Sequence, residues 1–332
     1  MTASWRFVAG LAAGFILSLG LTAMAFYLNL GVPCSELSRW TFEINQKKRS
    51  LAEQAPSPKL LLVGGSATLF GISAKEIQEQ TGFPTINLGT HAALGTTYIL
   101  HLAEQAAKPG DIVLLALEYE LYTSGKMTPA WADALAVDYI VSRDPAWLRS
   151  LSLREQWSVF MLTSAPRLVR GLKSRWGLAR PGGDPGIYSV RSLNECGDQI
   201  NHPKAARPAR RDQILQVKSL LGRGLPAHPA GFPAIEAFVR WAQARQIRVL
   251  ATFPNLCDQP DYHGVVGRQT AKAIEDFFAR LNVPVVGEYT DAALPPDEFF
   301  DTMYHLTDEA ELGRSQRLAA QLKPYLKTPG GR

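Results

Sequence analysis

Short apolar runs alternate with amphipathic stretches through the first and last thirds of the chain. The runs are brief and almost continuous, which is typical of strands that are buried on both faces of a parallel sheet. We expect strands at residues 59–63, 84–88, 111–117, 247–253 and 283–286. We expect helices at residues 73–82, 95–107, 233–246, 265–281 and 308–326. This alternation, with short turns between the elements, predicts an α/β fold with a doubly wound parallel sheet.

The alternation stops between residues 118 and 230, where no run has the pattern of a strand. Helical periodicity returns at 129–141 and 153–176, and a loop rich in glycine and proline is expected at 180–186. We interpret 120–230 as a helical insertion that partly covers the functional site. Its tryptophans fit either the core of the insertion or a surface that stacks on sugar rings.

The segment 7–30 contains no charged residue. At about 1.5 Å per residue it can cross a hydrocarbon layer of about 30 Å with some tilt. We expect an uncleaved membrane anchor within 1–31, although Ala23-Met24-Ala25 leaves open its removal as a signal sequence. A first hydrophobic segment of this kind exports the chain that follows it. We therefore expect a linker and helix at 32–58, a domain at 59–326 outside the cytoplasm, and a short tail at 327–332.

Positive charge is concentrated in one part of the chain. Residues 143–223 hold 15 Lys or Arg and 6 Asp or Glu, a net charge of +9 in a chain whose total is +5. No nucleic-acid-binding motif accompanies this stretch, so we expect no nucleic acid as a partner. A solvated basic face and a contact with an anionic glycan or lipid headgroup both remain open. The three cysteines have no zinc spacing, and at most Cys196 and Cys257 could pair in an oxidising compartment.

The first expected strand ends in Gly64-Gly65-Ser66. Open α/β sheets place their ligands at the carboxyl ends of the strands, and two glycines permit a tight turn there. Ser73-x-x-Glu76 then has the pattern of a capping box that begins a helix, which Gly82 ends. The glycine spacing does not fit a nucleotide-binding loop. The turn can instead present the Ser66 hydroxyl beside free backbone N–H groups, as a nucleophile and an oxyanion require.

Asp301 and His305 lie near the other end of the chain, just before the last expected helix. A serine hydroxyl needs a base to take its proton, and the base needs an acceptor that fixes its tautomer. Ser66, His305 and Asp301 supply these three roles, and we expect no other histidine to act as the base. No Cys/His cluster has ligand spacing, so we expect neither a metal nor a cofactor.

Three pieces together resemble the SGNH (GDSL-like) hydrolase superfamily: Gly64-Gly65-Ser66, Asn87-Leu88-Gly89 and Asp301 with His305-Leu306. The chain is most similar to the membrane-anchored, extracytoplasmic branch that contains the alginate O-acetylation proteins and the teichoic-acid D-alanylation protein. The resemblance covers about 59–117 and 247–326. It implies a flavodoxin-like, three-layer fold with a helical insertion and one amino-terminal transmembrane helix.

The resemblance also implies roles for individual residues. Ser66 would be the nucleophile and an oxyanion-hole donor, Gly89 a second donor, His305 the base and Asp301 its partner. Two departures matter. Asp301 precedes His305 by four residues, where Asp three residues before is common, so Asp297 is an alternative. The superfamily's Gly-x-Asn-Asp is replaced by Leu117-Glu118-Tyr119-Glu120, which leaves the third donor to Asn87 or Asn255.

The remaining expectations concern the reaction and its setting. His91, Asn255 and Tyr119 are candidate substrate-binding residues. The expected activity is transfer of an acyl group, most simply O-acetyl, to or from a cell-surface or secreted polysaccharide. A carbohydrate esterase with the same triad and a non-catalytic component of a glycan-export machine are the alternatives. A transferase would receive its acyl group from a membrane-bound partner protein, and the resemblance implies a bacterial inner-membrane protein whose domain is periplasmic.

Overall fold

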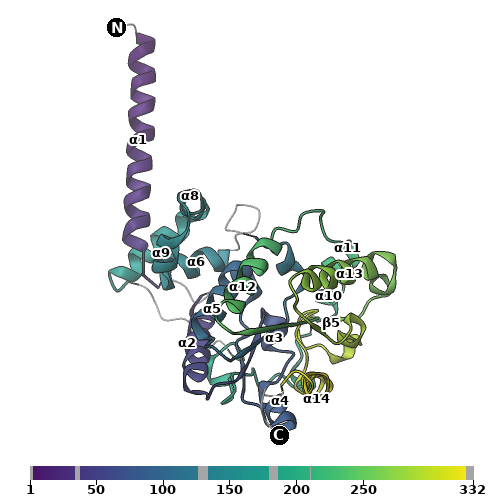
Figure 1. Cartoon of the computed structure of the whole chain (residues 1–332). Coiled ribbons are helices and arrows are strands. Elements are labelled where there is room, and N and C mark those ends of the chain that lie inside the picture. The colour runs from purple at the N-terminus through teal and green to yellow at the C-terminus, as the bar shows by residue number, and fades with distance from the viewer. Residues whose placement is uncertain (1–2, 34–37, 126–133, 179–185, 210, 327–332) are drawn as a thin grey trace. The chain divides into compact units, whose positions relative to one another are not determined.

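The computed structural model describes residues 3–33, 38–125, 134–178, 186–209 and 211–326 (Figure 1). The chain divides into two compact units, each made of two segments of sequence. We call residues 1–42 with 127–184 the anchor unit, and residues 43–126 with 185–332 the sheet unit. The predicted insertion at 120–230 is therefore shared between the two units.

The sheet unit is built on five parallel strands in the order β2-β1-β3-β4-β6. These are β1 (Leu60–Val63), β2 (Thr85–Asn87), β3 (Ile112–Leu115), β4 (Arg248–Thr252) and β6 (Val285–Val286). Each lies within a run that was predicted to be a strand. The sequence-based prediction of an α/β fold with a parallel sheet is confirmed.

Alternate side chains of the strands form the core of the sheet unit. Leu60, Leu62 and Leu114 pack with α4 (Ala74–Thr81) and α14 (Asp308–Leu322) in one cluster of buried side chains. Leu61, Val63, Val113 and Leu115 between them are equally buried. The helices α5 (Thr96–Ala106) and α12 (Phe232–Gln243) pack on each other and against β1 and β4. Burying one such side chain stabilises a fold by about 1.5–3 kcal/mol, so these helices hold the sheet rigidly.

Shorter elements complete the sheet unit. Most of α2 (Arg39–Gln54) belongs to it, and a second, two-stranded parallel sheet joins β5 to β7. The remaining α-helices and strands are α3 (Ser66–Leu69), α10 (Arg211–Ile214), α11 (Leu220–Arg223), α13 (Val265–Arg280), β5 (Leu256–Cys257) and β7 (Ala293–Leu294). The two buried cysteines of this unit, Cys196 and Cys257, are both free, so the pairing left open above is not formed.

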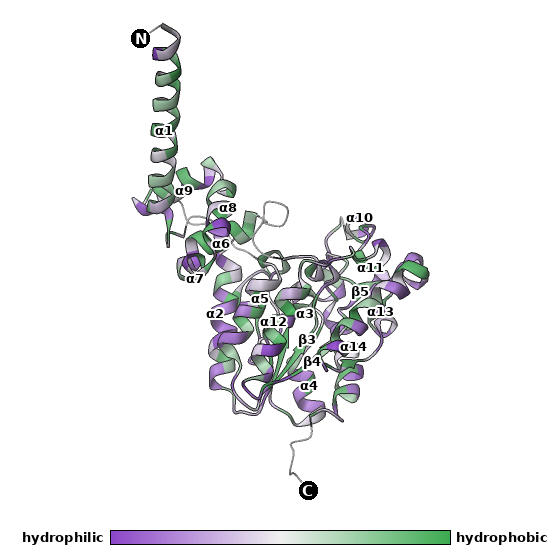
Figure 2. Cartoon of the chain, turned by 45° about the horizontal axis from the view of Figure 1, so that its top comes forward, coloured by the Kyte–Doolittle hydropathy of each residue, from purple (hydrophilic) through white to green (hydrophobic). Residues whose placement is uncertain are grey.

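The anchor unit is helical in its described residues. It contains α1 (Ala3–Asn29), α6 (Ala134–Arg143), α7 (Pro145–Ser150), α8 (Leu153–Leu162) and α9 (Ala165–Arg175). Among the described helices of the whole chain, α1 is the one long and apolar enough to cross a membrane (Figure 2). None of its most apolar 18 residues is buried. The same length and composition fit an amino-terminal signal sequence.

The stretch 153–176, which was predicted to be one helix, is two helices. Ser164 accepts a hydrogen bond from the Arg167 N–H and begins α9, whose first turn contains Pro166. A proline cannot donate the hydrogen bond that a continuous helix needs, so the chain turns at Thr163–Ser164 instead. The predicted loop at 180–186 and tail at 327–332, and the first part of the predicted helix at 129–141, lie almost wholly outside the described residues.

Candidate functional site

The turn after β1 presents Ser66 as the first residue of the short helix α3. A Cβ atom at Gly64 would lie 2.4 Å from the carbonyl oxygen of Ala116, and one at Gly65 would lie 2.4 Å from Oε1 of Glu118. Neither distance is possible for real atoms. Both glycines are therefore required by the close approach of this turn to the end of β3. The geometry agrees with the predicted order of strand, glycine turn and serine.

Glu118 lies directly beneath this turn. Its Oε2 accepts a hydrogen bond from the Gly65 N–H at 2.9 Å, and its Oε1 accepts one from the Ala67 N–H at 2.8 Å. The Ser66 N–H between them has no partner among the described residues. One carboxylate thus fixes the backbone on both sides of Ser66 and leaves the middle N–H for a ligand. Burial raises the pKa of Glu118 to about 7, against the opposing effect of the two N–H groups.

The raised pKa of Glu118 predicts how stability changes with pH. Between its ordinary value of 4.5 and about 7, the unfolded chain releases this proton while the folded chain retains it. Ionisation then favours the unfolded state, so Glu118 lowers the free energy of unfolding as the pH rises through this window. Glu118→Gln cannot titrate. Its free energy of unfolding should fall less between pH 5 and 8, by about 2–3 kcal/mol. Urea denaturation in detergent measures the free energy of unfolding of the wild type and the variant at each pH. An equal change between pH 5 and 8 in the two proteins would contradict the prediction.

His305 and Asp301 form the second half of the site. His305 Nδ1 lies 2.7 Å from Asp301 Oδ1, and the Tyr188 hydroxyl donates to Asp301 Oδ2 at 2.5 Å. Burial alone would raise the pKa of Asp301, but the hydrogen bonds from His305 and Tyr188 outweigh it and the pKa is lowered. Asp301 is therefore an anion that accepts the Nδ1–H of His305. The Nε2 of His305 has no hydrogen-bond partner in the described part of the chain, so it is the nitrogen left to accept a proton.

Phe70 connects the two halves of the site. Its N–H donates to the Ser66 carbonyl at 2.9 Å, one helical turn away, and its ring stacks on His305 with centroids 4.2 Å apart and planes at 12°. The stack places the imidazole against the helix that Ser66 begins. The Ser66 hydroxyl itself makes no hydrogen bond to His305 or to any other described residue. The hydrogen bond between a nucleophile and its base is often long before substrate binds, so Ser66 stays the candidate nucleophile although this bond is not formed.

Two of the three predicted oxyanion donors already donate hydrogen bonds to other groups of the protein. The Gly89 N–H donates to Asn87 Oδ1 at 2.8 Å. The Asn87 amide donates to the Thr68 carbonyl at 3.1 Å and to the Ile72 carbonyl at 2.8 Å. Asn87 is fully buried and ties β2 to the turn that follows α3. Of the three predicted donors, only the Ser66 N–H has no hydrogen-bond partner among the described residues. The Gly89 N–H and the Asn87 amide would have to give up their present hydrogen bonds before they could donate to an oxyanion.

A buried lysine supports the loop that carries Gly89. Lys48 Nζ donates to the Gly89 carbonyl at 2.5 Å and lies 3.4 Å from Asn87 Oδ1. Burial lowers the pKa of Lys48 to about 7, which the carboxylates of Asp198 and Glu311 oppose. The sequence offered no sign that this residue of a polar helix would reach beneath the site.

The other candidate residues have different surroundings. Tyr119 is 1% exposed and Asn255 is fully buried, with its amide donating to the Tyr304 carbonyl, so neither faces a substrate. His91 is partly exposed on the loop after β2, where its Nδ1 accepts the Ala93 N–H at 3.1 Å. Asp297, the alternative carboxylate, is exposed and pairs with Lys204 and Arg207. Its contacts therefore lead away from His305.

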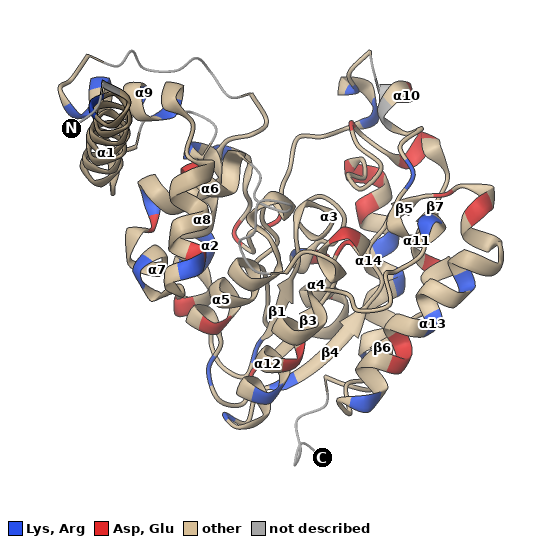
Figure 3. Cartoon of the chain, turned by 90° about the horizontal axis from the view of Figure 1, so that it is seen from above, with Lys and Arg blue, Asp and Glu red and all other residues tan. Residues whose placement is uncertain are grey.

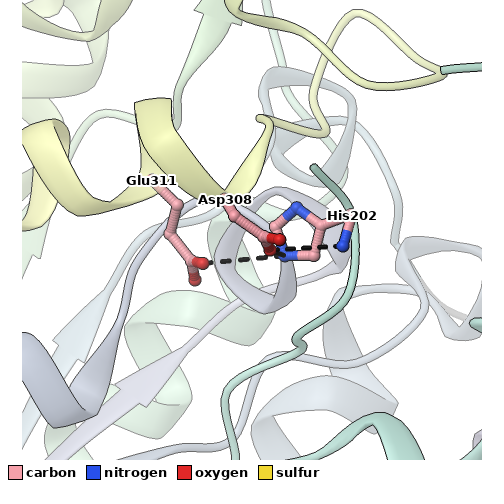
Figure 4. A group of neighbouring side chains, drawn as sticks. All are labelled: His202, Asp308 and Glu311. Carbon is pink, nitrogen blue, oxygen red and sulfur yellow. Dashed lines mark hydrogen bonds and ion pairs between the residues drawn. The ribbon is translucent and has the colours of Figure 1, made fainter. Parts of the chain in front are cut away.

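One group of described side chains has the composition of a metal site. Possible ligand atoms of His202, Asp308 and Glu311 lie within 4.8 Å of one another (Figure 4). However, His202 Nδ1 lies 2.9 Å from the Leu306 carbonyl and Nε2 lies 3.0 Å from the Gln199 carbonyl. Both ring nitrogens of His202 therefore already lie within hydrogen-bond distance of backbone carbonyl oxygens. These contacts tie residues 199–202 to the loop that carries His305.

Tyr188, Glu118, Phe70 and His202 were not predicted to belong to the site. Tyr188 and His202 come from the predicted insertion, where no local pattern indicates that the chain returns to Asp301. Glu118 had a detectable signal: it follows a strand that neighbours β1, so its carboxylate had to lie at the same sheet edge as Ser66.

Comparison with known proteins leaves the family of this chain open. It matches no protein-family model and none of the curated proteins. One solved structure, described as a "putative platelet activating factor from Streptococcus pneumonia", is similar at 12% identity over 86% of this chain and 91% of that chain, with a TM-score of 0.39. A likeness this slight carries no argument, and the proposals that follow rest on the contacts of this chain.

Proposed function

We propose that the chain is a serine-dependent acyl-ester enzyme in which Ser66, His305 and Asp301 act together. The observation that carries this proposal is the Asp301–His305 pair, 2.7 Å apart, which Phe70 stacks against the helix begun by Ser66. Ser66 and the Asp301–His305 pair come from distant parts of the sequence, and Ser66 and His305 both contact Phe70, shortly after the carboxyl end of β1. This is the sheet edge where α/β folds place their active sites.

We further propose that the sheet unit has the flavodoxin-like, three-layer architecture of the SGNH hydrolases. The order β2-β1-β3-β4-β6, with every pair parallel, supports this assignment. The packing of α4 with α14, and of α5 with α12, supports a helical layer on each side of the sheet.

The proposed reaction begins when Ser66 Oγ attacks the carbonyl carbon of an acyl ester. His305 Nε2 takes the hydroxyl proton, Asp301 stabilises the resulting imidazolium, and the Ser66 N–H donates to the oxyanion. Collapse of the intermediate releases the donor alcohol, which takes the proton from His305, and leaves an acyl group on Ser66. A sugar hydroxyl then attacks the acyl-enzyme, with His305 as base, and carries the acyl group away. Water in place of the sugar would make the enzyme an esterase.

The proposed setting is the outer face of a bacterial inner membrane, with α1 as a single-pass anchor. The substrate would be a cell-surface or secreted polysaccharide, the acyl group O-acetyl, and the acyl donor a membrane-bound partner protein. The apolar, unburied α1 supports the anchor. The choice of acceptor and donor rests on the sequence resemblance alone.

The direct test is mass spectrometry of the purified chain after treatment with an activated ester or a serine-directed phosphonate. We expect a single adduct on the peptide that contains Ser66. Supplying an acyl donor with and without an oligosaccharide acceptor then separates transfer from hydrolysis. An adduct on another residue, or none, would contradict the proposed nucleophile.

A non-catalytic role in glycan export or modification is the second candidate. It is favoured by the engaged Gly89 and Asn87 groups, which leave the described site with one free oxyanion donor, the Ser66 N–H. In that case the polysaccharide should still bind to the chain, while Ser66 should stay unlabelled.

Topology gives an independent prediction. A reporter enzyme fused after Arg332 should be active only outside the cytoplasm, because α1 is the one described helix able to span a membrane and it lies at the amino terminus. Paired fusions of alkaline phosphatase and green fluorescent protein measure the two sides. Fluorescence without phosphatase activity would show that the carboxyl terminus lies in the cytoplasm and would contradict the prediction.

A further inference from the structure

The helix α8 exposes a stripe of apolar side chains within the anchor unit. Leu153, Trp157 and Met161 are spaced four residues apart, on one side of the helix, and are 83%, 54% and 62% exposed. Fully burying one such side chain is worth about 1.5–3 kcal/mol, so a continuous stripe in water is unusual and indicates a surface that is covered by something.

Contacts inside the anchor unit fix this stripe near the end of α1. Phe160 of α8 meets Phe26 of α1 edge to face, with ring centroids 5.3 Å apart. Asn29 at the end of α1 donates to the Leu168 carbonyl at 3.2 Å and accepts from Arg167 at 2.6 Å. Both α8 and α9 are thus attached to the last two turns of the apolar helix.

The burial of α1 changes at the same level. Residues 4–24 are exposed, and from Ala25 onward most side chains are at least partly covered by the anchor unit. The exposed length corresponds to about 30 Å of helix, which is the thickness of a hydrocarbon layer. The water–membrane boundary therefore falls near Ala25, beside the Phe26–Phe160 contact.

The helix α9 adds positive charge and aromatic surface at this level. It contains no acidic residue, and Arg170, Lys173 and Arg175 are exposed (Figure 3). Trp176, directly after it, is 65% exposed. Arginine, lysine and tryptophan are the residues that proteins place at the lipid headgroups, where an apolar body and a polar tip are both satisfied.

We propose that α8 and α9 lie in the interfacial layer of the lipid bilayer that α1 spans, with Leu153, Trp157 and Met161 among the upper acyl chains and the cations of α9 at the lipid phosphates. This inference rests on the proposed anchoring role of α1. A bilayer explains the stripe better than a protein partner does, because the attachment to α1 already holds the stripe at the membrane boundary. The proposal also accounts for part of the positive charge of residues 143–223, because residues 143–184 belong to the anchor unit and would face anionic lipid.

The test uses the full-length chain in vesicles of phosphatidylcholine with some phosphatidylglycerol. Single cysteines at Leu153, Trp157 and Met161, labelled with the fluorophore NBD, are compared with labels at Gln156 and Ser158. These two control positions lie about 100° around the helix axis to either side of Trp157. The background is Cys34→Ser, since Cys196 and Cys257 are 4% and 1% exposed. Lipids that carry a nitroxide near the top of the acyl chain act as quenchers. The labels replace exposed or partly exposed side chains, so folding should be preserved, and circular dichroism checks this.

We expect the three stripe labels to emit at shorter wavelength and to be quenched severalfold more than the labels at Gln156 and Ser158. Equal, water-like emission at all five positions would overturn the proposal. The proposal would also be overturned if the label at position 157 emitted at shorter wavelength in native membranes but not in lipid vesicles, because a protein partner would then cover the stripe. Failure of the anchor itself is read separately, from the mass of the cellular protein, since cleavage after Ala25 would remove most of α1.

Discussion

Ser66→Ala is expected to abolish acyl transfer and covalent labelling while the chain stays folded. Removing the nucleophile or the base of a serine triad costs about 10⁶ in kcat, because the two act as one unit. His305→Ala should therefore be as inactive as Ser66→Ala, and the double variant no worse than either. The Ser66 side chain makes no hydrogen bond within the described chain, so its loss leaves no buried group unpaired. Burst kinetics with a chromogenic acetyl ester measure the effect.

Ser73→Ala is the matched control for Ser66→Ala. Ser73 lies seven residues away and caps α4, where its hydroxyl accepts the Glu76 N–H at 3.1 Å. Loss of a helix cap costs about 1 kcal/mol of stability, so this variant should melt earlier but retain the burst. If Ser66→Ala keeps wild-type modification of the polysaccharide, the enzymatic proposal fails and the non-catalytic role replaces it.

Asp301→Asn is expected to lower kcat by up to about 10⁴, since the asparagine no longer holds the imidazole in the correct tautomer. Asp297→Asn provides the comparison with the alternative carboxylate. The Asp297 side chain, which pairs with Lys204 and Arg207, is 63% exposed, and ion pairs of exposed groups contribute little to stability. The activity of Asp297→Asn should therefore equal that of the wild type. An inactive Asp297→Asn with an active Asp301→Asn would mean that the carboxylate is misassigned while the base is not.

The sheet was predictable because its strands carry their own signal. Runs such as 59–63 and 111–117 are apolar on both faces, and buried parallel strands need no partner to be recognised. Helix ends were predictable for the same local reason: Ser73 and Thr307 each accept an N–H of the helix that they begin, and Gly82 adopts the left-handed conformation (φ 68°) that ends α4.

The site was predictable only where its chemistry is local. Asp301 and His305 are four residues apart, so one loop brings them together, and Ser66 follows directly from a strand end. Tyr188 reaches Asp301 across 113 residues of sequence, and Lys48 reaches Gly89 across 41. Such contacts depend on tertiary packing, which no pattern within a window of sequence contains.

The division of the sheet unit has a consequence for how the chain is made. The neighbouring strands β3 and β4 pair Ile112 with Arg248, so 136 residues separate the two partners. At a synthesis rate of roughly 5–20 residues per second, β4 is made about 7–27 s after β3. During that time Ile112-Val113-Leu114-Leu115 offers an unpaired apolar edge to other nascent chains. The sheet can close only after β4 has been synthesised. A chaperone that holds unfolded chains should therefore raise the yield of this protein more than that of one whose strands are consecutive.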